Sequence, residues 1–260
     1  MSEFCSHPQI DSSRNLPLAD DEVHVWRFSL DLETPRVQSL QRTLASDEQA
    51  RANRFHFRRD RDRFIVARGL LRVVLARYLD TNPGQLRFCH NSYGKPSLVS
   101  IDGQDTLNFN VSHSQELGLY AITRNRRIGV DLEYIRTDFA YEQVAERFFS
   151  SRERATLRSL APRLKHQAFF TCWTRKEAYI KARGEGLSLP LDQFDVSLAP
   201  GGPAALLNTR GDPQEANRWS LRELKPGPGY VAALAVEGQG WQLRFWQWPA
   251  WMNKPIDEPM

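Results

Sequence analysis

The apolar residues in the first half of the chain follow two different periods. Residues 22–28 alternate between apolar and polar side chains, and this period of two predicts a strand. Over residues 60–79 the apolar positions recur every three or four residues, which predicts a long helix. Three further apolar segments predict strands over residues 107–111, 117–122 and 127–134.

The second half of the chain repeats this order of patterns. Ser150 followed by Glu153 has the spacing of a capping box, so a helix is expected to begin there. Pro162 then opens a predicted long helix that runs to Arg183 and is terminated by Gly184. Strands are predicted over residues 194–198, 219–224, 230–235 and 241–246.

The repeated order of elements predicts an α+β fold of two pseudo-duplicated halves. Each half is expected to be a mostly antiparallel sheet packed with a long helix, and the junction is expected near residues 123–126. The predicted parts are a flexible leader (1–20), an N-terminal half (21–124), a C-terminal half (125–246) and a tail (247–260). The tail begins in an aromatic stretch, Trp246 to Trp251, for which core packing is favoured over an exposed interaction surface.

The composition is that of a soluble globular protein. Of the 260 residues, 41% are hydrophobic and 25% are charged. No apolar run reaches the roughly 18–20 residues that span a bilayer, and the polar N-terminal segment lacks the apolar centre of a secretory signal, so no membrane partner is expected. The three cysteines, Cys5, Cys89 and Cys172, have no metal-binding spacing and leave one unpaired, which favours a cytoplasmic location.

Positive charge is concentrated in one segment, although the net charge of the chain is only +4. Residues 51–72 contain eight arginines and two aspartates, a local charge of +6 that leaves −2 on the remainder. The arginines are Arg51, Arg54, Arg58, Arg59, Arg61, Arg63, Arg68 and Arg72. Such a segment could meet a phosphorylated ligand or an acidic protein, or it could be a solvated helix face. Nucleic acid is not favoured as a partner, because no nucleic-acid-binding motif accompanies the arginines.

Two carboxylates stand on the predicted strand at residues 127–134. Asp131 and Glu133 alternate with apolar residues, so both side chains point to one face of the strand. Like charges on one face repel each other unless a cation lies between them, which makes a metal site one interpretation. Ordinary exposed strand carboxylates are the other.

The predicted helix at residues 162–183 carries a second charged cluster. Trp173, Glu177 and Lys181 follow one another at intervals of four residues, close to one face, and Lys176 lies beside them. Glu177 and Lys181 could form an ordinary helix-stabilising pair, but their apolar surroundings indicate charges that need partners. Three carboxylates with two lysines suit a magnesium ion and a phosphate-bearing substrate.

Residues 108–114, Asn-Phe-Asn-Val-Ser-His-Ser, end a predicted strand with short polar side chains. They could form a turn held by side-chain hydrogen bonds, or a loop beside a phosphate or a metal. A serine hydrolase is not expected, because Ser112 and His113 are adjacent, diverge on a strand and lack a G-x-S-x-G motif. The glycine-rich loops of ATP-binding and dinucleotide-binding folds are absent as well.

Five segments, taken in order, resemble the Sfp-type 4'-phosphopantetheinyl transferase family. The segments are Tyr93-Gly94-Lys95-Pro96, residues 108–114, residues 128–133, Arg147-Phe148-Phe149-Ser150 with Glu153, and residues 173–181 continuing to 189. The 46-residue gap between Asp131 and Glu177 also fits the family. The resemblance covers residues 45–200.

The resemblance implies two similar α/β halves with the active site in the cleft between them. The N-terminal half would bind the nucleotide of coenzyme A, and the C-terminal half would supply the metal and catalytic groups. The implied reaction is the Mg²⁺-dependent transfer of the 4'-phosphopantetheine arm of coenzyme A to a serine hydroxyl of an acidic apo carrier protein, acyl or peptidyl, with release of adenosine 3',5'-bisphosphate. An internally duplicated chain is expected to act as a monomer.

The resemblance also assigns roles to residues on the catalytic side. Asp131, Glu133 and Glu177 would hold Mg²⁺, and Glu177 would also be the candidate base, directly or through a bound water. Lys176 and Lys181 would contact phosphate oxygens, and Lys181 would take part in catalysis.

On the nucleotide side, the resemblance implies a second group of residues. The expected contacts of coenzyme A there are Arg51, Gly94, Lys95, Pro96, Ser112 and His113. His113 and Arg51 would meet the 3'-phosphate, and Arg54, Arg58 or Arg63 could share the role of Arg51.

Two other functions remain open from the sequence. The same carboxylates could serve a metal-dependent phosphoesterase that acts on coenzyme A-like substrates. The arginine-rich segment could instead belong to a non-catalytic module that binds an acidic protein.

Overall fold

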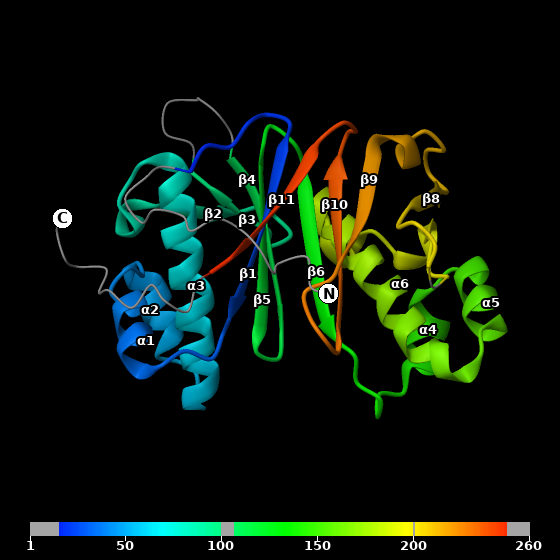
Figure 1. Cartoon of the computed structure of the whole chain (residues 1–260), viewed down its shortest axis with the longest axis horizontal. Coiled ribbons are helices and arrows are strands. Elements are labelled where there is room, and N and C mark those ends of the chain that lie inside the picture. Colours follow the sequence, from blue (N-terminus) through cyan, green and yellow to red (C-terminus); the bar gives the residue numbers. More distant parts are fainter. Residues whose placement is uncertain (1–15, 100–106, 200, 249–260) are drawn as a thin grey trace.

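Two sheets lie face to face at the centre of the protein, and helices cover the outer face of each (Figure 1). The computed structural model describes residues 16–99, 107–199 and 201–248. The mixture of helices and mostly antiparallel strands confirms the predicted α+β class. Within the described residues, no helix is both long enough and apolar enough to cross a membrane.

The first half contains the strands and the long helix that the sequence predicts. Its elements are β1 (Glu22–Ser29), α1 (Thr34–Gln41), α2 (Ser46–Ala52), α3 (Arg58–Leu79), η1 (Pro83–Gln85), β2 (Phe88–His90), β3 (Pro96–Leu98), β4 (Leu107–Ser114) and β5 (Leu117–Arg124). The short helices α1 and α2 pack with α3 on one face of the first sheet (Figure 1). The small hairpin of β2 and β3 was not predicted.

The first sheet has the strand order β11-β1-β5-β4, and both of its faces are buried. Strand β1 explains why. Its side chains Trp26 and Phe28 enter the core beneath the helices, whereas Val23 and Val25 enter a second core between the two sheets. The alternation that predicts the strand therefore separates two apolar environments rather than core from solvent.

The second half contains the second sheet, of order β6-β10-β9, with α6 across its outer face (Figure 1). Its elements are β6 (Ile128–Tyr134), α4 (Tyr141–Phe148), α5 (Ser151–Ser159), α6 (Pro162–Arg183), η2 (Gly186–Ser188), η3 (Leu191–Gln193), β7 (Phe194–Val196), β8 (Leu206–Thr209), η4 (Glu215–Arg218), β9 (Trp219–Leu224), β10 (Tyr230–Glu237) and β11 (Gln242–Gln247). The capping box of Ser150 and Glu153 is present at the start of α5. Gly184 ends α6 in the left-handed conformation, with φ of 77°, as predicted.

Helix α6 approaches strand β6 unusually closely at Gly129. A Cβ atom built at Gly129 would lie 2.1 Å from the carbonyl oxygen of Ala178 and 2.4 Å from the nitrogen of Ala182. A side chain at this position would therefore force the helix away from the sheet. The close approach brings the face of α6 that carries Lys181 onto the strand that carries the predicted carboxylates.

The last strand differs from the prediction. Strand β11 pairs in parallel with β1 and so belongs to the first sheet, although residues 125–246 were expected to form the C-terminal half. Order along the chain does not reveal this return, because the partner strand lies at the other end of the sequence. Trp246 stacks on Trp26 with ring centroids 5.5 Å apart, and Trp248 packs against the same core, so core packing of the aromatic tail is confirmed for these two residues. Residues 249–260, including Trp251, lie outside the described residues.

The prediction of a flexible leader over residues 1–20 does not hold for residues 16–20. Leu16 and Leu18 are buried in the first core, and the Leu16 amide donates to the carbonyl oxygen of Arg77 at 3.1 Å. These contacts place residues 16–20 in the folded part of the protein. Residues 1–15, the rest of the predicted leader, lie outside the described residues.

Candidate active site

A cavity of about 380 Å³ lies where β4, β6 and α6 meet. Its walls are formed by Val111, Ser112, His113, Asp131, Leu132, Glu133, Trp173, Glu177 and Lys181. The carboxylates predicted on a strand, Glu177 and Lys181 of the predicted helix, and the Ser112-His113 pair therefore face one space. Because β4 comes from the first sheet and β6 and α6 from the second half, the cavity lies between the two halves.

Asp131 is buried in the wall of this cavity, with one carboxylate oxygen bonded and the other without a partner. Its Oδ1 accepts hydrogen bonds from Lys181 Nζ at 2.6 Å and from Ser112 Oγ at 3.0 Å. Its Oδ2 is buried and has no hydrogen-bond partner. A buried, unpaired carboxylate oxygen is costly, so Oδ2 is a position that a bound cation or donor would stabilise.

Glu133 and Glu177 stand in an environment that disfavours their charged forms. Burial and the charge of Asp131 raise the pKa of Glu133. Burial, followed by the charges of Asp131 and Glu133, raises the pKa of Glu177 to about 7, although Lys181 opposes this shift. The three carboxylates thus repel one another across the cavity, and a cation between them would reverse that effect.

The chemistry of the cavity fits a magnesium ion. Within the described parts of the chain, no three His, Cys, Asp or Glu side chains are grouped closely enough to form an all-protein metal site. Mg²⁺ rarely needs such a cage, because it is commonly held by one or two carboxylates together with substrate phosphates and water. The unpaired Oδ2 of Asp131 and the mutually repelling Glu133 and Glu177 supply hard oxygen donors of the required kind.

Lys181 lines the cavity. Besides Asp131, its Nζ contacts Ser112 Oγ at 3.2 Å and the carbonyl oxygen of Val130 at 3.3 Å. Its side chain is 29% exposed, so the ammonium group can meet a ligand in the cavity.

Lys176 does not lie in the cavity, and the prediction that it contacts phosphate is wrong. Its Nζ is fully buried, where it pairs with Glu153 Oε1 at 2.8 Å and donates to the carbonyl oxygens of Leu191 and Phe194 at 2.7 Å each. Successive helix residues point about 100° apart, so Lys176 projects to a different side of α6 from Glu177. Its partner Glu153 belongs to the capping box, a signal that the sequence already contained.

His113 lies in the cavity wall, and two positive charges act on it. Desolvation against the wall and the charges of Lys181 and Arg63 lower its pKa. Among the arginines considered for the 3'-phosphate, Arg63 is therefore one whose charge acts on His113. Arg51 does not line the cavity; its guanidinium lies over the ring of Phe64, 5.2 Å from the centroid.

Gly94, Lys95 and Pro96 do not line the cavity either. The Lys95 ammonium donates to the carbonyl oxygens of Ile128 at 3.0 Å and Ala182 at 3.2 Å, so it joins the start of β6 to the end of α6. Burial and the charge of Arg127 lower its pKa to about 8. Contact of this segment with a nucleotide stays a prediction.

Much of the arginine-rich segment has partners inside the protein. Arg68 and Arg72 both pair with Glu48, and Arg72 is buried. Arg63 forms a bidentate ion pair with Asp31, in which Nε and Nη2 donate to the two carboxylate oxygens at 2.7 and 2.8 Å. Arg58, Arg59 and Arg61 also reach aspartates. Part of the segment therefore stabilises the first half, and the remainder is an exposed basic surface.

Ser114 was not assigned a role from the sequence. Its Oγ donates to Glu133 Oε2 at 3.1 Å, two residues along β4 from the contact between Ser112 and Asp131. The alternation of a strand is the signal that could have identified it, because residues two apart share a face.

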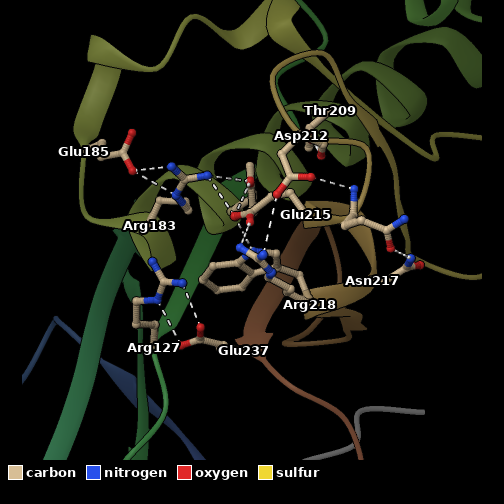
Figure 2. Close-up of polar contacts among 12 residues, drawn as sticks. Arg127, Arg183, Glu185, Thr209, Asp212, Glu215, Asn217, Arg218 and Glu237 are labelled. Carbon is tan, nitrogen blue, oxygen red and sulfur yellow. Dashed lines mark hydrogen bonds and ion pairs between the residues drawn. The ribbon is translucent and has the colours of Figure 1, made fainter.

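Arg183, in the last turn of α6, belongs to a network of ion pairs. Figure 2 shows Arg183 between Glu185 and Glu215, with Arg218 on the other side of Glu215. The buried Glu215 also accepts from the Trp219 indole at 2.9 Å. The network ties the last turn of α6 to β9, and so supports the turn that contains Lys181.

A second cavity, of about 420 Å³, lies between α6 and the turn that joins β9 to β10. The one carboxylate in its wall, Glu223, is paired with Arg175 at 3.0 Å. It therefore lacks the convergent carboxylates of the cavity at Asp131, which is the stronger candidate for chemistry.

Two family models match successive parts of the chain. Residues 33–124 match the family described as 4'-phosphopantetheinyl transferase, N-terminal, and residues 127–235 match the 4'-phosphopantetheinyl transferase superfamily. The first match ends at residue 124 and the second begins at residue 127.

Individual relatives extend over most of the chain. The 4'-phosphopantetheinyl transferase HetI of Nostoc sp. is 46% identical over 242 residues, covering 93% of this chain and 99% of the relative. The 4'-phosphopantetheinyl transferase ffp of Bacillus subtilis is 30% identical, covering 78% of this chain and 85% of the relative. The transferase Sfp of Bacillus subtilis is 29% identical, covering 74% and 82%. The chain therefore belongs to the 4'-phosphopantetheinyl transferase superfamily of enzymes.

Proposed function

We propose that the protein transfers the 4'-phosphopantetheine arm of coenzyme A to a serine hydroxyl of an apo carrier protein. The observation that supports this most directly is the convergence of Asp131, Glu133, Glu177 and Lys181 on one cavity, in a chain of this family. The serine oxygen forms a bond to the phosphorus that bears the pantetheine arm. The bond from that phosphorus to the bridging oxygen of the pyrophosphate breaks, and adenosine 3',5'-bisphosphate leaves with the electron pair.

The pyrophosphate is the part of coenzyme A that the cavity suits. Asp131, Glu133 and Glu177 are the residues that would hold Mg²⁺, which when bound neutralises pyrophosphate charge and increases the electrophilicity of phosphorus. Lys181 contributes a second positive charge from the helix, and its present acceptors, Asp131 and Ser112, hold it at the cavity wall. Phosphoryl transfer depends mainly on positioning and charge stabilisation, and these residues supply both.

Glu177 is the group best suited to accept the serine proton. Burial and the neighbouring carboxylates raise the pKa of Glu177 to about 7 in the metal-free site, which makes this carboxylate more basic than an ordinary glutamate. It lines the same cavity as Asp131 and Lys181, where the pyrophosphate of coenzyme A would bind. The proton passes to Glu177 directly or through a water.

The nucleotide and the carrier would approach from the first half. His113 and the charge of Arg63 suit the 3'-phosphate of coenzyme A. The exposed Arg54 and Arg58 would attract an acidic carrier protein and steer it towards the cavity.

The test is intact-mass measurement of apo carriers after incubation with the protein, Mg²⁺ and coenzyme A. A mass gain equal to one phosphopantetheine arm is expected, and it should disappear in excess EDTA. Asp131→Asn and Glu177→Gln should reduce transfer at least about 100-fold, since they remove groups that stabilise the transition state. Glu146→Gln is the matched control, because Glu146 is 51% exposed and pairs with Arg158 outside the cavity.

Two outcomes would overturn the proposal. One is the absence of any mass gain on a panel of acyl and peptidyl carriers. The other is release of phosphopantetheine from coenzyme A without a carrier, which would identify a metal-dependent phosphoesterase.

A further inference from the structure

The two halves meet along an edge where strands are joined by side chains instead of main-chain pairing. Strand β4 is the last strand of the first sheet, and β6 is the first strand of the second. Each pairs with its own sheet on one side only, so each presents an unpaired edge to the other. Exposed strand edges carry unbonded amide and carbonyl groups, which must find partners when they are covered.

Three side chains of β4 supply those partners. Asn110 Oδ1 accepts from the Val130 amide at 2.8 Å, Ser112 Oγ from the Leu132 amide at 3.1 Å, and Ser114 Oγ from the Tyr134 amide at 3.1 Å. The donors and the acceptors both advance by two residues. Asn110, Ser112 and Ser114 thus form a ladder of three side-chain hydrogen bonds, each called a rung here. This side-chain ladder joins β4 to β6, where main-chain hydrogen bonds would join two neighbouring strands of one sheet.

The two serine rungs have a second contact that reaches the cavity. A serine hydroxyl has one proton, and its oxygen can accept two hydrogen bonds. Because the oxygen of Ser112 accepts the Leu132 amide, its proton is free to point at Asp131 Oδ1, 3.0 Å away. The same geometry lets Ser114 donate to Glu133 Oε2 at 3.1 Å.

We propose that Ser114 is a positioning residue that fixes the carboxylate of Glu133, in the way that Ser112 fixes that of Asp131. The first half of the protein thereby sets the orientation of two carboxylates that belong to the second half. This inference rests on the proposed function, in which Glu133 holds Mg²⁺. Glu133 is only partly buried and has three rotatable bonds, so without a donor at its Oε2 the carboxylate would sample several orientations.

Partners of a metal-holding carboxylate affect affinity strongly, and their loss commonly weakens metal binding by about 10–100-fold. Ser114→Ala should therefore weaken Mn²⁺ binding about 10-fold. Ser114→Thr retains a hydroxyl at the same position and should restore binding to within about threefold of the unmodified protein.

Asn110→Ala is the matched control. It removes one of the three hydrogen bonds of the side-chain ladder between β4 and β6, but Asn110 Oδ1 accepts that bond from the Val130 amide and does not orient a carboxylate. Both alanine variants should lower the midpoint of thermal unfolding, because each leaves an amide without its acceptor. Only Ser114→Ala should change the affinity for the metal, and Asn110→Ala should stay within about twofold of the unmodified protein.

The experiment is a titration of each full-length protein with Mn²⁺ in the presence of coenzyme A and without a carrier, with free Mn²⁺ measured by electron paramagnetic resonance. Equal Mn²⁺ affinity in Ser114→Ala and the unmodified protein would overturn the inference. Equal weakening in Ser114→Ala and Asn110→Ala would do so too, since the ladder would then act only by joining the sheets. If the unmodified protein does not bind Mn²⁺ with coenzyme A, the proposed metal role fails, which is a different result.

Discussion

Replacing Lys176 by methionine would separate a structural role from a chemical one. The Lys176 ammonium is fully buried and makes three contacts, with Glu153 at 2.8 Å and with the carbonyl oxygens of Leu191 and Phe194 at 2.7 Å each. Methionine is similar in length but removes the charge and every donor. Loss of one partner of a buried ion pair costs about 3–5 kcal/mol, because the other charge remains buried without compensation.

The surroundings of Glu153 place the expected loss near the lower end of this range. Its carboxylate would still accept from the amides of Ser150 and Val196, at 2.9 and 2.8 Å. The two carbonyl oxygens lose a charged donor, which adds to the cost. We expect the free energy of unfolding of Lys176→Met to fall by about 3 kcal/mol, as measured by urea denaturation followed through tryptophan fluorescence.

Activity gives the second half of this test. The folded fraction of Lys176→Met should transfer phosphopantetheine at a rate within a few-fold of the unmodified protein, because Lys176 does not face the cavity. Lys181→Met is the matched comparison for activity, and its transfer should be strongly reduced because Lys181 faces the cavity. Adding Glu153→Gln to Lys176→Met should recover part of the lost stability, since the buried charge is then removed. A stable but inactive Lys176→Met protein would refute the structural assignment.

Three further perturbations test other parts of the structure. Gly129→Ala should lower stability by at least about 2 kcal/mol and reduce transfer, because its Cβ would lie 2.1 Å from the Ala178 carbonyl oxygen; unchanged unfolding in urea would contradict the close packing of α6. Burial lowers the pKa of His24 from 6.5 to about 4, so about 3 kcal/mol of unfolding free energy that is present above pH 6.5 is lost as the pH falls towards 4. His24→Gln should therefore flatten the dependence of the unfolding free energy on pH between 6.5 and 4. An unaltered slope would contradict the burial of a neutral His24. Glu215→Gln should cost about 1–3 kcal/mol in urea denaturation, because it weakens the charged contact with Arg183 at 2.8 Å, and a neutral effect would show that the network of Figure 2 is not stabilising.

Local patterns predicted most of the elements in this protein. The helix at Pro162–Arg183 begins at a proline, ends at a glycine and carries apolar residues between them, so neighbouring residues alone specify its bounds. The positions of Asp131 and Glu133 on one face follow from the geometry of any strand. That they meet Glu177 in one cavity could be expected only through the family resemblance, since no local rule relates β6 to α6.

Other features depend on contacts between distant segments. The role of Lys176 was misjudged because a lysine near Glu177 has the same local pattern whether it turns to a ligand or to Glu153. The place of β11 in the first sheet depends on its register with β1, which sequence periodicity does not contain. The role of Ser114 requires the two sheet edges to be side by side, which is a property of the assembled fold.

The pairing of β11 with β1 has a consequence for how the protein can fold during synthesis. Glu22 is aligned with Gln242, so the first sheet joins residues separated by 220 positions and the whole second half lies between them in sequence. A ribosome must therefore release the second half before the first sheet gains its fourth strand, and such distant pairings are formed slowly. A fragment that ends at residue 124 would expose the edge of β1 and leave Trp26 without Trp246. The part of the chain up to residue 124 therefore cannot complete its own sheet without the last strand of the second half.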